Sequence, residues 1–212
     1  MSTITADPDY RLLQGQTWQD YQQALAERDR SGRRYRITYD RGVLEIMPVS
    51  PPHARWQMQI AMLLSAYAAE KGIPFDVLGP FTCQREELER GIEPDTCFYV
   101  EHEAQVRGRD IDLDTDPLPD LAIEVEVSRP TTVRRIGIYA AFGVPEVWRD
   151  DGTTLSVLLL NPDGTYAPAT ASRAFPSLPL DEVIRRLAAA ATTDRATWLR
   201  DWQAWVRANA AG

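Results

Sequence analysis

Two acidic positions lie where a pair of strands could bring them together. Asp95 follows a proline and precedes the apolar run 96–100, so its carboxylate is expected at the end of a strand. In residues 121–127 the side chains alternate between two faces, which places Glu124 and Glu126 on the same face. If Asp95 and Glu124 meet across a ladder, they provide the one or two carboxylates that Mg²⁺ usually takes from a protein. Such an ion can activate a water molecule as the nucleophile and stabilise charge on a phosphate oxygen.

The same residues also have ordinary structural interpretations. A half-buried strand can display Glu124 and Glu126 to solvent, although neighbouring carboxylates repel each other unless a positive charge lies between them. A Pro-Asp pair such as residues 94–95 is also common in turns. From the residues alone, a metal site and an exposed strand are both open.

The composition restricts which metal a site could hold. The two histidines, His53 and His102, are too few for a multi-histidine site, so carboxylates must be the main ligands, which favours hard ions such as Mg²⁺ or Mn²⁺. Cys83 and Cys97 are too few and too far apart for a zinc knuckle or a disulfide framework, and buried reduced thiols are expected. The 23 basic residues include a single lysine, Lys71, so a mechanism that needs a catalytic lysine must use it or accept arginine.

The charge balance is acidic and uneven. A net charge of -8 and a pI near 4.9 argue against a surface that coats nucleic acid in general. The acidic residues are concentrated between residues 86 and 126, where fourteen of them face three arginines. The expected interpretation for Asp110, Asp112, Asp114 and Asp116 is a solvated surface, while another part of the cluster could converge around a cation.

The length of 212 residues and the 44% hydrophobic content suit one domain with a substantial core. The start of the chain lacks the pattern of a secretory signal, and no apolar run approaches the roughly 20 residues that span a bilayer. A cytoplasmic protein without a membrane segment is therefore expected. We predict a single domain over residues 1–212, with a core of about 11–180 and a C-terminal helical extension of about 181–208.

Hydrophobic periodicity predicts a mixed α/β domain in which helices flank a mainly antiparallel or mixed sheet. Prolines 48, 51 and 52 are expected to break the chain before a helix that begins near residue 53, and the stretch 101–116 is expected to be an exposed loop with at most a short strand at Ile111. The helices are predicted over 17–27, 53–70, from 131 or 132 to 142, 181–191 and 193–208, and the strands over 35–39, 43–47, 75–78, 96–100, 121–127, 147–149 and 154–160, with an unassigned segment at 81–85.

The last helix carries an apolar stripe of Leu199, Trp202, Trp205 and Val206. A stripe of this kind usually packs within the chain or across a dimer, so a homodimer is one expectation.

Several of these segments together resemble the Uma-type family of restriction endonucleases, which belongs to the PD-(D/E)xK nuclease superfamily. The resemblance rests on Pro-Asp-Leu-Ala-Ile-Glu-Val at 119–125 and Tyr-Ala-Ala-Phe-Gly-Val-Pro-Glu-Val-Trp at 139–148, and it extends through 44–47, 50–53, 91–99 and 174–176. It covers roughly residues 11–206. Each motif is weak by itself, but the set is specific.

The resemblance implies a restriction-endonuclease-like core with a metal held by Asp95 and Glu124. It also implies a lysine, which many members carry on the following helix one turn before the tyrosine, and that position is Arg135 here. The strand position two residues after Glu124 is Glu126 rather than lysine. Arginine stays protonated, so Arg135 could stabilise charge or orient a carboxylate but is a poor general base. The structural alternative for Arg135 is an ion pair with Glu124 or Glu126 without any metal.

Two further residues are candidates for the site. Glu45 points away from Leu44 and Ile46 in its strand, so it is either a third inward-facing carboxylate or an exposed hairpin position. His53, at the expected start of a helix, either caps and packs or acts as a base. Glu126, His53 and bulk hydroxide are the unranked candidates for a general base.

Two functions follow from these observations. The first is a metal-dependent phosphodiesterase that acts on DNA, which must find its phosphate contacts locally because the chain is acidic; the candidates are Arg107, Arg109, Arg129, Arg134 and Arg135. The second is a nuclease-fold protein that no longer cleaves and serves as a binding or assembly module.

Overall fold

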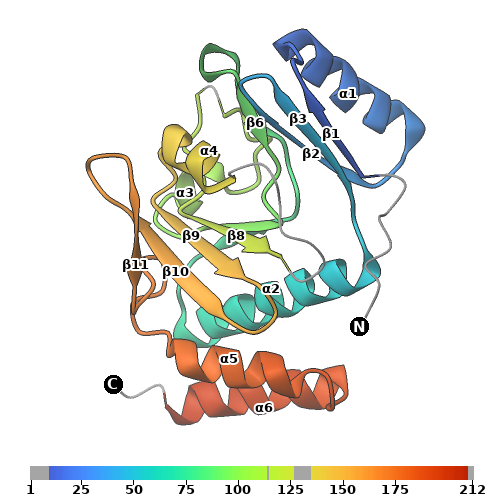
Figure 1. Ribbon diagram of the computed structural model, residues 1–212. Helices are drawn as coiled ribbons and strands as arrows, with labels where there is room; N and C mark the ends of the chain where they lie inside the picture. The colour runs from blue at the N-terminus through green and yellow to red at the C-terminus, as the bar shows by residue number, and fades with distance from the viewer. Residues whose placement is uncertain (1–9, 114, 127–134, 210–212) are drawn as a thin grey trace.

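Two sheets and six helices make up the part of the chain that the computed structural model describes, residues 10–113, 115–126 and 135–209 (Figure 1). The N-terminal sheet is antiparallel and has the order β1-β3-β2-β6-β5. The central sheet is mixed and has the order β11-β10-β9-β8-β7-β4. The strands are β1 (Arg11–Gln14), β2 (Tyr35–Asp40), β3 (Val43–Pro48), β4 (Asp76–Leu78), β5 (Cys83–Arg85), β6 (Arg90–Ile92), β7 (Thr96–Tyr99), β8 (Leu121–Val125), β9 (Glu146–Asp150), β10 (Leu155–Leu160) and β11 (Tyr166–Ala169). The expected mixed α/β class is confirmed, with two sheets where the periodicity had suggested one.

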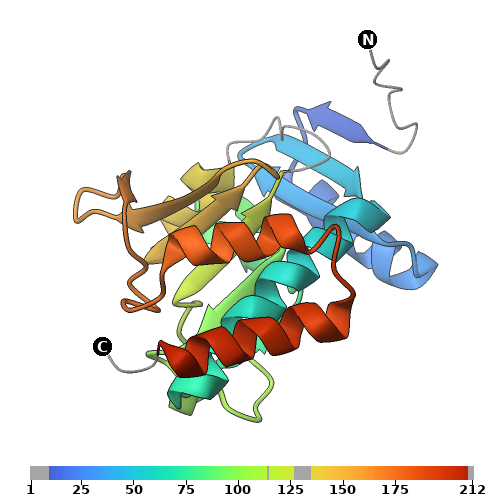
Figure 2. The ribbon, with the colours of Figure 1, turned by 90° about the horizontal axis from the view of Figure 1, so that it is seen from below.

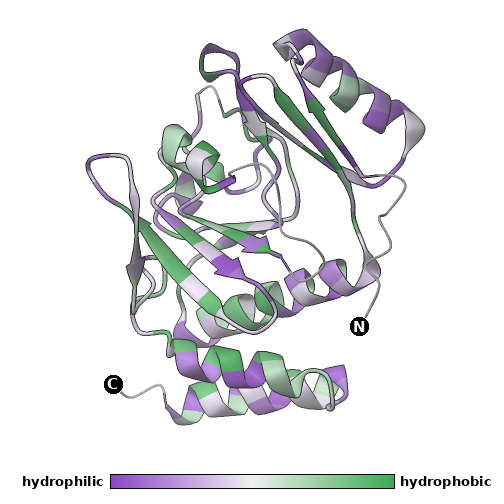
Figure 3. Cartoon of the chain, in the orientation of Figure 1, coloured by the Kyte–Doolittle hydropathy of each residue, from purple (hydrophilic) through white to green (hydrophobic). Residues whose placement is uncertain are grey.

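Helix α1 (Trp18–Ser31) covers the N-terminal sheet, and its start follows the expected capping chemistry. The side chain of Thr17 accepts a hydrogen bond from the N–H of Asp20, and the Asp20 carboxylate accepts one from the N–H of Thr17. Only Tyr21 and Leu25 are buried, which agrees with the mostly hydrophilic colouring of α1 in Figure 3. The Tyr21 ring stacks on Tyr39 of β2, with centroids 5.3 Å apart.

Helix α2 (Pro51–Lys71) begins earlier than the prolines suggested. Ser50 is the N-cap, and Pro51 and Pro52 form part of the first turn. A proline is tolerated there because the first N–H groups of a helix have no partner within it. The prediction that these prolines precede the helix was therefore wrong. The end at Lys71, capped by Gly72 at φ 65°, agrees with expectation.

The central sheet contains the strand pair on which the site is built. All five residues of β8 are buried, and β8 pairs with β7 antiparallel and with β9 in parallel. Helix α4 (Arg135–Phe142) lies in the crossover from β8 to β9, as parallel neighbours require. Its predicted beginning at residue 131 or 132 falls outside the described residues. α2 packs against this sheet, and the two C-terminal helices lie on the far side of α2 (Figures 1 and 2).

The acidic stretch after β7 is more structured than the predicted loop. A short helix, α3 (Glu103–Val106), buries both its first and last residues. No strand forms at Ile111. Asp110 and Asp112 are exposed as predicted, whereas the Asp116 carboxylate is largely buried and lies 3.0 Å from the guanidinium of Arg109. Asp114 is outside the described residues.

The C-terminal helices α5 (Leu180–Ala189) and α6 (Arg195–Ala208) complete the core around α2. Trp198, Trp202 and Val206 of α6 are buried, and the Trp202 indole N–H donates to the carbonyl of Leu63 in α2 at 2.8 Å. The aromatic stripe therefore packs within the chain and gives no support to a dimer. Of the helices described, none is both long and apolar enough to span a membrane. Cys83 and Cys97 are buried free thiols, as expected.

Gly91 is required by the close approach of α1 to the N-terminal sheet. A Cβ at residue 91 would lie 2.1 Å from the hydroxyl oxygen of Tyr21, whose ring is fixed against Tyr39. We expect Gly91→Ala to lower the free energy of unfolding by about 1–3 kcal/mol, as overpacking does. Gly137→Ala in α4, where a Cβ has nothing within 4 Å, is the matched control. It is expected to raise the free energy of unfolding by about 0.5–1 kcal/mol, because alanine favours a helix more than glycine does. Urea denaturation measures both; equal stabilities would contradict the close approach.

Candidate functional site

The carboxylates of Asp95 and Glu124 are neighbours at the centre of the molecule. Thr96 pairs with Ile123 in the β7–β8 register, so one step further Asp95 stands opposite Glu124, and the Asp95 N–H donates to the Ile123 carbonyl at 3.2 Å. The predicted meeting of these two residues across a ladder agrees with this register. Asp95 is 1% exposed and Glu124 is 3% exposed.

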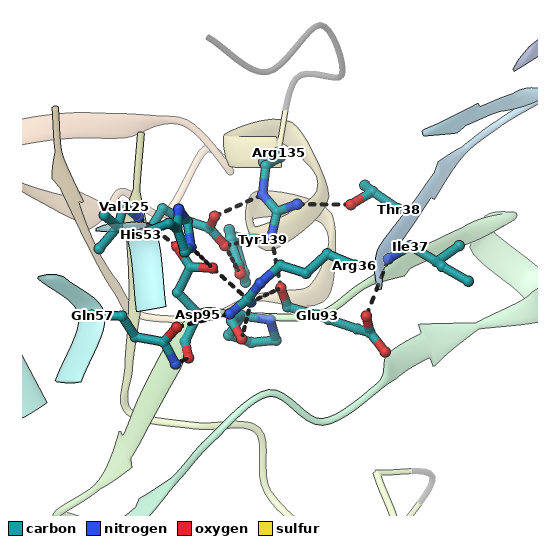
Figure 4. Close-up of polar contacts among 12 residues, drawn as sticks. Arg36, Ile37, Thr38, His53, Gln57, Glu93, Asp95, Val125, Arg135 and Tyr139 are labelled. Atoms are coloured by element: carbon teal, nitrogen blue, oxygen red, sulfur yellow. Dashed lines mark hydrogen bonds and ion pairs between the residues drawn. The ribbon is translucent and has the colours of Figure 1, made fainter. Parts of the chain in front are cut away.

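Asp95 is surrounded by donors from three elements (Figure 4). Its Oδ1 lies 2.6 Å from the Arg36 guanidinium of β2 and 2.9 Å from Nε2 of His53 in α2. Its Oδ2 accepts a hydrogen bond from the N–H of Val125 at 2.6 Å. Burial acts to raise the pKa of Asp95, but the charge of Arg36 and the hydrogen bond with His53 outweigh it, so the pKa lies below its usual value.

Glu124 is paired with Arg135 of α4. The Nε and one terminal nitrogen of Arg135 lie 2.7 and 3.0 Å from the two oxygens of Glu124, and the Tyr139 hydroxyl donates to Oε1. Burial, together with the charge of Asp95, raises the pKa of Glu124. The pKa of Arg135 is also raised because Glu124 outweighs burial, so its guanidinium keeps its charge. The alternative that Arg135 pairs with Glu124 is thus observed.

The Arg135 guanidinium also joins the two sheets (Figure 4). It donates to the hydroxyl of Thr38 in β2 at 2.8 Å and to the carbonyl of Glu93 at 2.6 Å. One side chain thereby contacts β8, β2 and the segment before β7. Helix α4 therefore carries one of the side chains that link the two sheets.

Sequence reasoning missed several members of this cluster, among them Arg36 and Glu93. Arg36 lies in a strand whose alternation is clear, but nothing in the sequence indicated that its partner was Asp95. The Glu93 carboxylate is buried, accepts from the N–H of Ile37 at 3.1 Å and is ion-paired with Arg28. Its position in an acid-proline-acid triplet was the only available signal.

The buried charges of the cluster balance. Three carboxylates face three guanidiniums, in the pairs Asp95–Arg36, Glu124–Arg135 and Glu93–Arg28. Neutralised pairs satisfy the requirement that a buried charge be compensated. Each of these three carboxylates therefore has a guanidinium partner within the chain.

Glu126 and Glu45 occupy different surroundings. Glu126 follows the end of β8, is partly exposed and lies 2.8 Å from the Arg149 guanidinium, so it does not share the partner of Glu124. Glu45 is buried and accepts from the Tyr10 hydroxyl at 2.9 Å, which excludes the exposed-hairpin interpretation. It stands opposite Thr38 in the β2–β3 register, so it shares the sheet face that Arg135 contacts.

His53 lies in the first turn of α2, which Ser50 caps, and packs against Asp95; the alternative that it acts as a base stays a prediction. Its backbone N–H faces the Ser50 cap oxygen at 3.4 Å, while its Nε2 contacts Asp95. Because this nitrogen is engaged by a carboxylate, His53 is placed to orient Asp95.

A divalent ion fits the donor chemistry of Asp95 and Glu124, since two adjacent carboxylates are what Mg²⁺ commonly takes from a protein. All four carboxylate oxygens, however, already contact donors of the chain. Within the described residues, no cluster of three or more potential metal-ligating side chains occurs. A bound ion would therefore have to exchange with, or share, the oxygens held by Arg36 and Arg135.

Comparison with protein families gives one match. The family model Uma2, described as a putative restriction endonuclease, matches residues 18–192. This range contains every residue of the Asp95–Glu124 cluster and all the elements that carry it. A comparison with curated proteins found no match.

The Arg135–Glu124 pair generates a stability prediction. Arg135→Met leaves Glu124 buried without its partner, and we expect a loss of about 3–5 kcal/mol in the free energy of unfolding. The control Arg30→Met, which breaks an exposed pair with Glu27, is expected to cost about 0–1 kcal/mol. The double variant Arg135→Met, Glu124→Gln should recover part of the loss because no unpaired charge is left. Equal denaturation midpoints for Arg135→Met and Arg30→Met would show that the buried pair does not form.

A second prediction concerns acid. The folded pKa of Asp95 lies below the unfolded value of about 3.9, so its contribution to stability is complete above that value and is lost as the pH falls through the folded pKa. We expect the stability gap between the wild type and Asp95→Asn to narrow below about pH 4. The exposed control Asp110→Asn should match the wild type. Urea denaturation as a function of pH tests this; a gap that stays constant down to acid unfolding would refute it.

Proposed function

This chain belongs to the Uma2 family, and from this premise we propose that it is a metal-dependent nuclease that hydrolyses phosphodiester bonds in DNA. Family membership itself suggests a nuclease-like function. The observation that carries the finer proposal is the pair of carboxylates, Asp95 and Glu124, side by side where β7 and β8 meet. We propose these two as the ligands of Mg²⁺ or Mn²⁺.

Asp95 and Glu124 would hold the ion, and the chemistry that it would supply is polarisation of the scissile phosphate and activation of a water molecule. The role of His53 is to hold Asp95 in position through Nε2. Arg135 cannot accept a proton, so its contribution is to orient Glu124 and to stabilise negative charge on the phosphate.

The general base in this proposal is Glu126. It is a carboxylate beyond the end of β8 whose side chain is 18% exposed, while His53 has its Nε2 engaged by Asp95. Glu45 faces the same region from the N-terminal sheet and would act as a supporting carboxylate.

The DNA contacts and the oligomeric state belong to the same proposal. Arg107 and Arg109 are more than half exposed, but each is paired with an acidic residue, Glu103 and Asp116 respectively. Arg129 and Arg134 lie outside the described residues. A homodimer that aligns two sites would increase the number of phosphate contacts.

A second candidate function is a nuclease-fold module that binds without cleaving. It is favoured by the balanced charges of the cluster and by the engagement of all four carboxylate oxygens. In this case Arg135 is a structural replacement for the family's lysine, and the cluster serves stability only.

Metal binding separates the two functions. If the nuclease proposal is right, millimolar Mn²⁺ well above its dissociation constant should stabilise the wild type by on the order of 1–3 kcal/mol. Arg135→Lys should increase the shift, because an ammonium holds Glu124 through a single point rather than a planar fork. Asp95→Asn should abolish it, while Asp110→Asn, at an exposed position, should leave it unchanged.

The same four proteins are then assayed for cleavage of single-stranded and double-stranded DNA with Mg²⁺ and Mn²⁺. Cleavage by the wild type that Asp95→Asn removes supports the nuclease. No thermal shift and no cleavage, in the wild type or in Arg135→Lys, would reject it in favour of the non-cleaving module.

A further inference from the structure

An arginine-lined recess lies beside the carboxylate cluster. A cavity of about 470 Å³ is formed between β2, α2 and the segments before β5 and β7. Its charged lining consists of four arginines and one glutamate, namely Arg28, Arg33, Arg34, Arg36 and Glu93. Such an excess of positive charge is unexpected in a chain with a net charge of -8.

A second cavity of about 370 Å³ adjoins the first. The two share Arg28, Arg33 and Tyr35, and the second adds Arg11 and Glu27 between α1 and the N-terminal sheet. We refer to the two cavities together as the arginine groove. Its walls carry five arginines against two glutamates, so it is positively charged as a whole.

The partners of these arginines within the described part of the chain differ. Arg28 and Arg36 are paired with Glu93 and Asp95, but the exposed Arg34 side chain has no hydrogen-bond or ion-pair partner among the residues described. Arg33 is also exposed, and its guanidinium donates to the Tyr35 hydroxyl at 3.2 Å. The buried Nε of Arg36 lacks a hydrogen-bond partner in the same part of the chain. The exposed guanidiniums of Arg33 and Arg34 suit an anion with several oxygens, such as a phosphodiester.

The groove is also lined by two aromatic rings and a methionine. Tyr35 lies in the wall shared by the two cavities, and Phe81 and the exposed Met58 line the first one. Arginines interleaved with aromatic rings are the arrangement that binds single-stranded nucleic acid, because phosphates meet the cations and bases stack on the rings. In a duplex the bases are already stacked, and they are not available to Tyr35 or Phe81.

From these observations we infer that the arginine groove binds a single-stranded nucleic acid strand, with its phosphates at Arg33 and Arg34 and a base stacked on Tyr35. The inference rests on the proposed nuclease function for the nature of the ligand. The first cavity leads the strand toward the site, because Arg36 and Glu93 line the cavity and also belong to the carboxylate cluster.

The test measures the binding of a fluorescent 12-nucleotide single strand of DNA. EDTA is present to remove divalent ions, so that cleavage plays no part. We expect the wild type to bind, and the double variant Arg33→Gln, Arg34→Gln to bind on the order of tenfold or more weakly. The slope of the logarithm of the binding constant against the logarithm of the salt concentration should be shallower by about 1.4. Each of the two lost phosphate contacts removes about 0.7 from this slope.

The matched control is Arg185→Gln, Arg200→Gln. It removes the same two charges from exposed positions on α5 and α6, away from α1 and β2 in Figure 1. It should bind as the wild type does. Tyr35→Leu should weaken binding on the order of tenfold through lost stacking, and Tyr35→Phe should retain it.

Several outcomes would overturn the groove. These are no binding by the wild type at low salt, equal weakening by the two double variants, or equal affinity for the strand and for a nucleoside monophosphate. Binding in EDTA that depends on Arg33 and Arg34, without cleavage under any metal, would sustain the groove and reject the nuclease. Cleavage that is unaffected by the loss of both Arg33 and Arg34 would sustain the nuclease and reject the groove.

Discussion

The ion pair between Arg135 and Glu124 is the interaction on which the arrangement of the two sheets depends. Glu124 lies in the central sheet, and the same guanidinium reaches Thr38 in the N-terminal sheet. The second buried pair repeats this design, since Arg36 belongs to the N-terminal sheet and Asp95 precedes a strand of the central sheet. Both arginines thus bridge the sheets at the point where the carboxylates would otherwise repel each other. Removing either charge would leave its partner uncompensated in a buried place, which is far more costly than losing a surface pair.

Arginine at residue 135 makes more stabilising contacts than a lysine would, but it cannot take part in proton transfer. A guanidinium can lie against both oxygens of Glu124, donate to one of them and still donate to Thr38 and to a carbonyl, which an ammonium on a flexible stem cannot do with the same geometry. The same property removes any role in proton transfer. The family's chemistry and this chain's local structure therefore favour different functions at one residue, and only the metal-binding and cleavage measurements separate them.

Much of the fold could be predicted from local signals, but most of the hydrogen bonds and ion pairs of the site could not. The β2–β3 hairpin, the Thr17 cap and the buried strand at 121–125 follow from turn chemistry and side-chain alternation, which act over a few residues. The meeting of Asp95 with Glu124 was predictable because both lie at recognisable positions in two strands. The partnership of Arg36 with Asp95 was not, since it joins residues 59 apart from different sheets, and no local pattern encodes how two sheets pack. The prolines at the start of α2 did not mark the residue at which the helix begins, because the first turn of a helix accepts proline.

The neutrality of the cluster also connects the metal site with the arginine groove. A dication entering a region where each carboxylate is already matched by a guanidinium adds uncompensated positive charge, so the free chain should hold it weakly. A strand in the groove would bring phosphate charges next to Arg36, which lines the groove and also holds Asp95. Those negative charges would compensate the ion, and the ion would in turn favour the strand, because the coupling between two binding sites is reciprocal. A nuclease built this way would hold its metal more tightly with its substrate bound than in the free chain, where millimolar metal is needed.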